Sequence, residues 1–138
     1  MGNITNFTSV FDTFRNPDTT YFSEDLTGWD MGNALHLSFM FYGSYGNPNI
    51  STWNTSSTID MWGLFEDTAA FNGDIGQWDT SRVVELGQTF RNASAFNQNL
   101  DLWDTSRVES LYYTFAFASS FDGEIASWDV TRVTSMVR

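Results

Sequence analysis

Oxygen-bearing side chains recur four residues before each of five tryptophans, in the column Asp25, Asn49, Asp74, Asn99 and Glu124. In stacked copies of a repeat, neighbouring members of such a column lie about 5 Å apart. Calcium takes about six to eight oxygen ligands of this kind, so Asp25, Asp74, Asn99 and Glu124 are weak candidate ligands. The glycine-spaced loops of known calcium binders are absent, so we predict no resident metal. Asp74, Asn99 and Glu124 are also candidates for contact with a binding partner.

Acid–base or nucleophilic catalysis has little support in the sequence. A catalytic triad needs a base beside a nucleophile. The sequence has one histidine, His36, and a single histidine is more often an ordinary packed or surface residue than a catalytic base. The 17 acidic residues are distributed along the chain by the repeat. They do not form the pair of carboxylates in two different environments that acid–base catalysis needs. We predict no catalytic residues, no cofactor and no enzymatic activity; a pocket joining His36 to two carboxylates would favour an enzyme.

A second polar column directly follows the tryptophans. Each of its last three aspartates precedes an arginine by three residues, in the pairs Asp79 and Arg82, Asp104 and Arg107, and Asp129 and Arg132. Exposed ion pairs contribute about 0–1 kcal/mol each. The pattern therefore predicts an aspartate–arginine lattice that sets the register between copies, and not a functional charge site.

Aromatic residues outside the main columns are candidates for binding. Trp62 and Tyr112 occupy the same position of two different copies, and Tyr113, Phe39 and Tyr42 lie nearby in phase. Large aromatic side chains that stay exposed serve as anchors for partners. Two interpretations remain open: Trp62, Tyr112 and Tyr113 bind a protein or glycan, or they pack against adjacent copies.

Sequons for N-glycosylation are the last candidate sites. The pattern Asn-x-Ser/Thr occurs at Asn3, Asn6, Asn49, Asn54 and Asn92. It suits a glycosylated surface protein, although a chain rich in Asn, Ser and Thr produces several sequons by composition alone.

Charge and composition exclude several classes of function. The 138 residues include 17 acidic side chains, six arginines and no lysine or cysteine, for a formal net charge of −11. A polyanion such as nucleic acid would be repelled by such a surface. No stretch approaches the roughly 20 apolar residues of a membrane span.

The elements that carry these candidates belong to a repeat of about 25 residues, marked by Trp29, Trp53, Trp78, Trp103 and Trp128. An aliphatic residue stands three positions before each tryptophan, and a phenylalanine follows twelve positions after the first four. One tryptophan per copy at constant phase is what packing requires, so we predict that this column is core and binds no ligand. In the first copy, Phe7, Val10 and Phe14 are expected to match Val83, Leu86 and Phe90. Residues 1–138 would then form a single solenoid domain that starts and ends within a repeat.

Each copy is expected to contain one strand and one helix. The apolar residues Val83, Leu86, Phe90 and Ala93 have the spacing of one helical face, which predicts a helix from about Ser81 to Arg91. The segment from Asp74 to Trp78 suits a short strand that pairs with its equivalent in the next copy. The predicted fold is an α/β repeat, a right-handed solenoid of about five coils, each with a short parallel β-strand and a helix.

The motif Trp-Asp-Thr-Ser-x-Val occurs at 78–83 and 103–108, with a close variant at 128–133, whereas the copies at Trp29 and Trp53 depart from it. This pattern resembles the BspA-like repeat of bacterial surface proteins and lipoproteins, which is related to leucine-rich repeats. The resemblance covers nearly the whole chain. It implies a leucine-rich-repeat-like fold, an extracellular or cell-surface location, and adhesion or protein binding without catalysis.

Two functions are therefore expected. The first is a non-enzymatic cell-surface or extracellular module that binds a protein or glycan on another surface. The alternative is a structural solenoid that self-associates end to end into a filament or surface layer, because the partial repeats at both ends could complete each other.

Overall fold

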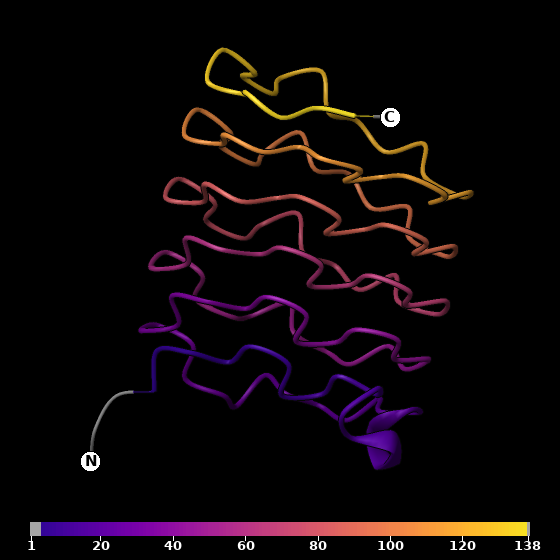
Figure 1. Ribbon diagram of the computed structural model, residues 1–138. Helices are drawn as coiled ribbons and strands as arrows, with labels where there is room; N and C mark the ends of the chain where they lie inside the picture. The colour runs from indigo at the N-terminus through magenta and orange to yellow at the C-terminus, as the bar shows by residue number, and fades with distance from the viewer. Residues whose placement is uncertain (1–3, 138) are drawn as a thin grey trace.

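The computed structural model describes residues 4–137 and shows a stack of similar coils. Successive coils are displaced along one axis, so the two ends of the chain lie at opposite ends of the stack (Figure 1). Isolated parallel bridges join equivalent residues of neighbouring coils, in the column Asn6, His36, Asp60, Glu85, Ser110 and Ser135. From His36 onward the members of this column are 24 or 25 residues apart, which is the predicted repeat length.

The predicted α/β solenoid, with a strand and a helix in each coil as in leucine-rich repeats, is wrong. Over residues 4–137, the one helix is the short 3-10 helix η1, Pro17–Thr19, and strand pairing is limited to isolated bridges. The segment from Ser81 to Arg91 consists mainly of turns, and Asp74 to Trp78 forms no strand. Within the described residues no helix has the length and apolar character that a membrane crossing requires.

Consecutive turns replace the predicted helix because alternate N–H groups point along the stack. The N–H groups of Leu86, Gln88, Phe90 and Asn92 donate to carbonyl oxygens of the next coil at 2.7–3.1 Å. Of the N–H groups between them, those of Thr89 and Arg91 donate to the carbonyl oxygens three positions earlier and close turns. Gln88 and Asn92 adopt φ angles of 56° and 57°, in the left-handed region that a right-handed helix excludes.

Aromatic columns fill the interior. The prediction that the tryptophan column is core is confirmed for the middle coils and is wrong for Trp29, which is 39% exposed because its coil lies at the end of the stack. Trp53, Trp78 and Trp103 are only 2–4% exposed. The indole N–H of Trp78 donates to the Ile50 carbonyl oxygen of the preceding coil at 3.2 Å, and the Trp53 and Trp78 ring centroids lie 6.1 Å apart. Phenylalanine rings form a parallel column in the same interior. Each coil therefore shields the aromatic layer of its neighbours from water.

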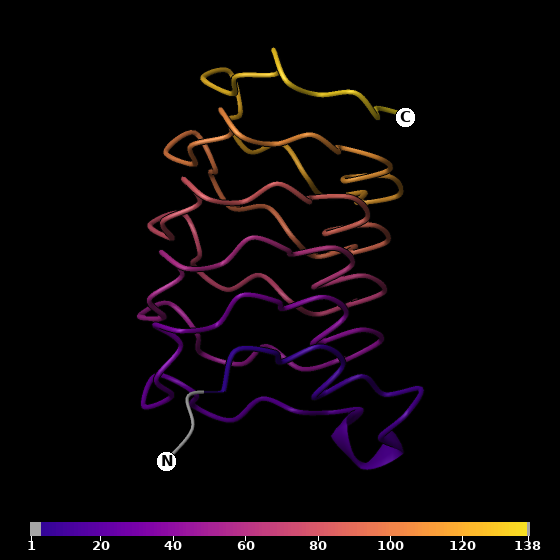
Figure 2. The ribbon, with the colours of Figure 1, turned by 60° about the vertical axis from the view of Figure 1, so that its left-hand side comes forward.

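The first coil has a different phase from the predicted one. Phe11 is buried and stacks on Phe41 with ring centroids 5.4 Å apart, whereas Val10 and Phe14 are 37% and 86% exposed. Phe11, not Phe14, is therefore the first member of the phenylalanine column. The segment from Phe11 to Phe22 is five residues longer than its counterpart in the next coils. This insertion contains η1, which stands out at the N-terminal end of the stack (Figure 2).

Candidate functional site

One side of the stack, which we name the turn wall, consists of the segments 36–43, 60–67, 85–92 and 110–117. Trp62, Gly87 and Tyr112 occupy equivalent positions in three successive segments. The Trp62 and Tyr112 rings stack with centroids 6.1 Å apart and planes at 14°. They meet across Gly87, where a side-chain carbon would lie 2.3 Å from the Trp62 ring. The prediction that Trp62 and Tyr112 share a position is confirmed, although the position belongs to a turn and not to a helix.

The predicted third aromatic residue, Tyr113, joins this pair. Its ring meets Tyr112 edge to face, with centroids 4.5 Å apart and planes at 72°. The interpretation that these residues pack within the stack therefore holds in part, because the rings contact one another. They also stay partly exposed, and binding of a protein or glycan by them stays a prediction.

A groove of about 380 Å³ runs beside the stacked pair, and we name it the tryptophan groove. Its lining consists of two aromatic rings, two carboxylates and three hydroxyl side chains, from Trp62, Glu85, Glu109, Ser110, Tyr112, Thr134 and Ser135. It therefore places aromatic side chains next to negative charge.

The carboxylates in and near the tryptophan groove differ in their hydrogen bonding. The Asp60 carboxylate accepts bonds from the Ser38 hydroxyl and, at 2.9 Å, from the Trp62 N–H. No residue between 4 and 137 donates a hydrogen bond to the carboxylate of Glu85 or Glu109. Burial, followed by the charges of Asp60 and Glu109, raises the pKa of the Glu85 carboxyl. Glu85 and Glu109 thus keep their acceptor capacity for another molecule.

His36 lies against a single carboxylate. Its Nδ1 atom is 3.5 Å from Oδ2 of Asp60, the same oxygen that accepts the Ser38 hydroxyl. Histidine and serine both contact the aspartate, so the three do not form the nucleophile–base–carboxylate sequence of a triad.

A second groove on the turn wall, of about 420 Å³, lies nearer the N-terminal end. It is lined by Ser9, Asp12, Phe14, Arg15, Phe39, Tyr42, Glu66 and Gln88, and we name it the phenylalanine groove. Oε1 of Glu66 lies 2.6 Å from Nη1 of Arg91, and Oδ2 of Asp12 lies 3.6 Å from Nε of Arg15. Burial raises the pKa of the Glu66 carboxyl, and Arg91 opposes that rise. The carboxylates of this groove are therefore paired within the chain.

The oxygen-bearing column proposed for calcium lies away from the turn wall and serves local turns. The side-chain oxygens of Asp25, Asn49, Asp74 and Asn99 each accept the N–H of the residue two positions later, at 2.8–3.4 Å. Asn99 Nδ2 also donates to Glu124 Oε2 at 3.5 Å, and Asp74 and Asn99 line a shared groove. Residues 4–137 contain no group of three or more histidine and acidic side chains arranged to hold a metal.

The aspartates of the predicted aspartate–arginine lattice also cap turns. Hydrogen bonds from Ser81 and Ser106 lower the pKa of Asp79 and Asp104. The charge of Arg107 lowers the pKa of Asp104 further, yet in the described part of the chain no pair of this lattice comes within 4 Å. The register between these coils comes instead from buried hydroxyls: Thr80, for example, donates to the Asp104 carbonyl oxygen at 3.1 Å.

Four of the five sequons fall on exposed residues, Asn6, Asn49, Asn54 and Asn92. Asn3 lies outside the described residues. Glycosylation of these asparagines stays a prediction.

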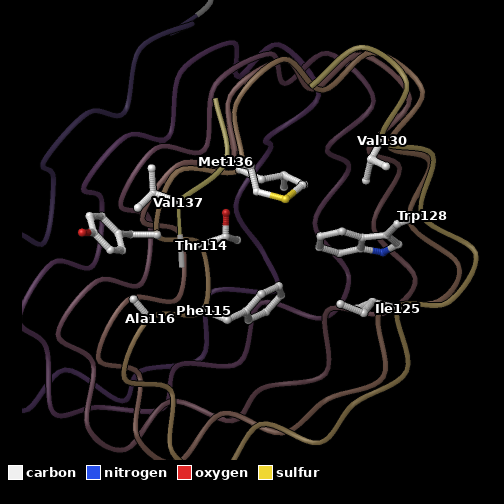
Figure 3. Close-up of a pocket in the computed structure, with 10 residues that line it drawn as sticks. Thr114, Phe115, Ala116, Ile125, Trp128, Val130, Met136 and Val137 are labelled. Atoms are coloured by element: carbon white, nitrogen blue, oxygen red, sulfur yellow. The ribbon is translucent and has the colours of Figure 1, made fainter. Parts of the chain in front are cut away.

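The C-terminal end of the stack exposes the interior. A hollow of about 460 Å³ there is lined mainly by apolar side chains, and Phe115, Ile125, Trp128 and Met136 point toward its centre (Figure 3). Inside the stack, the Ile75 carbonyl oxygen accepts the indole N–H of Trp103 at 3.0 Å. The end surface at Ile125, the equivalent of Ile75, thus has the character of an internal contact between coils.

Sequence reasoning missed Glu85, Glu109 and the role of Gly87. The one available signal was the glycine itself, which interrupts the position that Trp62 and Tyr112 share. Because a glycine leaves space beside the backbone, aromatic rings on either side of it along the column can meet.

No curated protein and no solved structure matches this chain. One family matches over residues 1–46 and 44–138, which together span the whole sequence. The chain with these stacked coils therefore belongs to the family described as Mycoplasma protein of unknown function, DUF285.

Proposed function

We propose that this chain is a non-enzymatic module, extracellular or on the cell surface, that binds a protein or glycan on another surface. The observation that carries the proposal is the stacked pair of Trp62 and Tyr112, which borders a groove and stays partly exposed on the turn wall. Aromatic anchors at the centre of a patch contribute much of the binding energy in protein interfaces. The side of an extended stack also suits contact with a large partner.

The location and the adhesive role are supported by the likeness of Trp-Asp-Thr-Ser-x-Val to the BspA-like repeat of bacterial surface proteins. That motif recurs at 78–83 and 103–108. Each copy directly precedes a segment of the turn wall along the chain, so the repeated motif preserves the coil while side chains on the turn wall differ from coil to coil. A constant core with a varied face is the arrangement expected of a binding module.

The test is adhesion of beads coated with the chain to a panel of purified extracellular-matrix proteins and glycans. The wild-type chain should adhere to at least one member, and Trp62→Ser should lose that adhesion. Leu102→Ser is the matched control, because Leu102 is 71% exposed and lies outside the turn wall. Equal adhesion by the two variants would contradict the proposal.

A second candidate function, end-to-end self-association, is favoured by the apolar hollow at the C-terminal end. The occupant would be the first coil of a second copy, whose Trp29 is 39% exposed, against 2–4% for Trp53, Trp78 and Trp103. Trp29 would stack on Trp128 and donate its indole N–H to the Ile125 carbonyl oxygen, which repeats the internal contact. A head-to-tail interface of this kind propagates into a filament.

Sedimentation velocity over a range of concentrations tests this second candidate. The wild-type chain should grow beyond a monomer, and Val130→Asp in the hollow should prevent that growth. A wild-type chain that stays monomeric at all concentrations would rule it out.

A further inference from the structure

The tryptophan groove carries negative charge that no arginine between residues 4 and 137 neutralises. Of the arginines that the structure describes, none has a nitrogen within 4 Å of a carboxylate oxygen of Glu85 or Glu109. Arg15 is paired with Asp12, and Arg91 is paired with Glu66. The phenylalanine groove, on the same wall, has both of its acidic residues paired. The two grooves are similar in size but differ in whether their carboxylates are paired. The unpaired carboxylates of the tryptophan groove are therefore not a general property of an acidic protein.

The same groove is lined by two aromatic rings. Trp62 and Tyr112 lie with their planes at 14° to one another and both line the groove with Glu85 and Glu109. A cation over the face of a tryptophan or tyrosine is attracted by the ring electrons, and tryptophan is the strongest of these partners. Aromatic rings and carboxylates around one groove thus favour the same kind of group.

That group is more readily a guanidinium than an ammonium. The guanidinium is planar, stacks on aromatic rings, is weakly hydrated and presents several N–H donors to carboxylates. A neutral glycan would leave the Glu85 and Glu109 carboxylates without a cation. A partner protein with exposed arginines would also be attracted by the net charge of −11.

We propose that the tryptophan groove binds an arginine side chain of a partner protein, with the guanidinium over the Trp62–Tyr112 pair and its N–H groups on the Glu85 and Glu109 carboxylates. The inference rests on the proposed function and names the chemistry of the partner. It makes the binding salt-dependent, because part of the attraction is between charges near the surface.

The experiment is an NMR titration of the full chain with the peptide acetyl-Gly-Arg-Gly-Gly-Arg-Gly-amide. The Trp62 indole N–H and the Gly87 amide should shift and saturate. The double variant Glu85→Gln/Glu109→Gln should weaken binding about tenfold, the loss expected when two exposed ion pairs are removed. Trp62→Leu, which keeps every charge, should weaken it as well.

Matched controls separate this site from diffuse attraction. The variant Glu24→Gln/Asp122→Asn makes the same change in net charge at exposed residues that do not line the groove, and it should bind as the wild type does. A loss equal to that of Glu85→Gln/Glu109→Gln would overturn the proposal. So would equal binding of the citrulline peptide, which keeps the shape and lacks the charge, or of the lysine peptide.

The two proposals fail in different ways. If the arginine peptide does not bind while Trp62→Ser still abolishes adhesion, the arginine assignment is wrong and the binding module stands. If the peptide binds in the groove while Trp62→Ser leaves adhesion intact, the groove recognises arginine but does not serve adhesion.

Discussion

Replacement of Trp78 by alanine is the most direct test of the stacked interior. Trp78 is 3% exposed, stacks on Trp53 with ring centroids 6.1 Å apart, and donates its indole N–H to Ile50. Removal of a fully buried tryptophan from a packed core costs about 3–5 kcal/mol of unfolding free energy. The transfer value for the buried indole, about 4–6 kcal/mol, is the upper bound.

Two further variants show how much of that loss comes from packing, from the hydrogen bond and from the position of the coil in the stack. Trp78→Phe keeps most of the packing and should cost about 1–2 kcal/mol, because the lost hydrogen bond is worth about 1 kcal/mol. The Ile50 carbonyl oxygen keeps a hydrogen bond in this variant, since it still accepts the backbone N–H of Trp53 at 3.2 Å. Trp29→Ala is the control at the end of the stack, where the side chain is 39% exposed, and it should cost about half as much as Trp78→Ala.

Urea unfolding, with hydrogen exchange to locate the weakened coil, measures these losses. If Trp29→Ala destabilises the chain as much as Trp78→Ala, the tryptophans do not act through mutual burial and the reasoning is refuted.

Three further outcomes are expected. Gly87→Ala places a carbon 2.3 Å from the Trp62 ring, so it should move the Trp62 indole signal in NMR spectra and cost about 1–3 kcal/mol in urea unfolding; an unchanged Trp62 signal would contradict the stacked geometry. Thr80→Val keeps the shape of a side chain that is 1% exposed and removes its hydrogen bond to Asp104, so it should cost about 1 kcal/mol, and a neutral result would show that this bond does not hold the coils. The pKa of Asp79 is lowered in the folded chain, so its stabilising effect is present above the unfolded value of about 3.9 and is lost as pH falls through the folded one; Asp79→Asn should therefore show a smaller drop in unfolding free energy between neutral and acid pH, and an equal drop would assign acid sensitivity to other groups.

Interior residues of the middle coils were predictable from the sequence because each coil repeats the same packing problem. Trp78 and Phe90 each recur at a spacing of about 25 residues, and both are buried. At the end of the stack a coil has only one neighbour, so the repeat constrains it less. The wrong phase assigned to Phe14, which is 86% exposed, reflects this weaker constraint and the insertion that follows.

The predicted helix failed because its evidence did not distinguish two backbones. Side chains at Val83, Leu86 and Phe90 point inward both on a helix and in the observed succession of turns. The decisive feature is the left-handed φ at Gln88 and Asn92. Glycine, aspartate and asparagine tolerate that conformation best, and the equivalents of Asn92 in two other coils are Gly43 and Asp67. That column was the missed signal.

Of the candidate site, the pairing of Trp62 with Tyr112 was predictable and the acidic part was not. Glu85 and Glu109 differ from the residues that occupy their positions in other coils, and a search for columns passes over a residue that occurs once. Their proximity depends on how the turns bring two coils together, which composition and spacing do not contain.

The placement of the two chain ends at opposite ends of the stack (Figure 1) has a mechanical consequence. Tension between them would load the coils in series, and each coil is attached mainly to its neighbours. The stack would then lengthen in steps as coils peel away one at a time. Each step would release about 80–90 Å of extended chain, the contour of one repeat, so the tension would fall each time a coil unfolds.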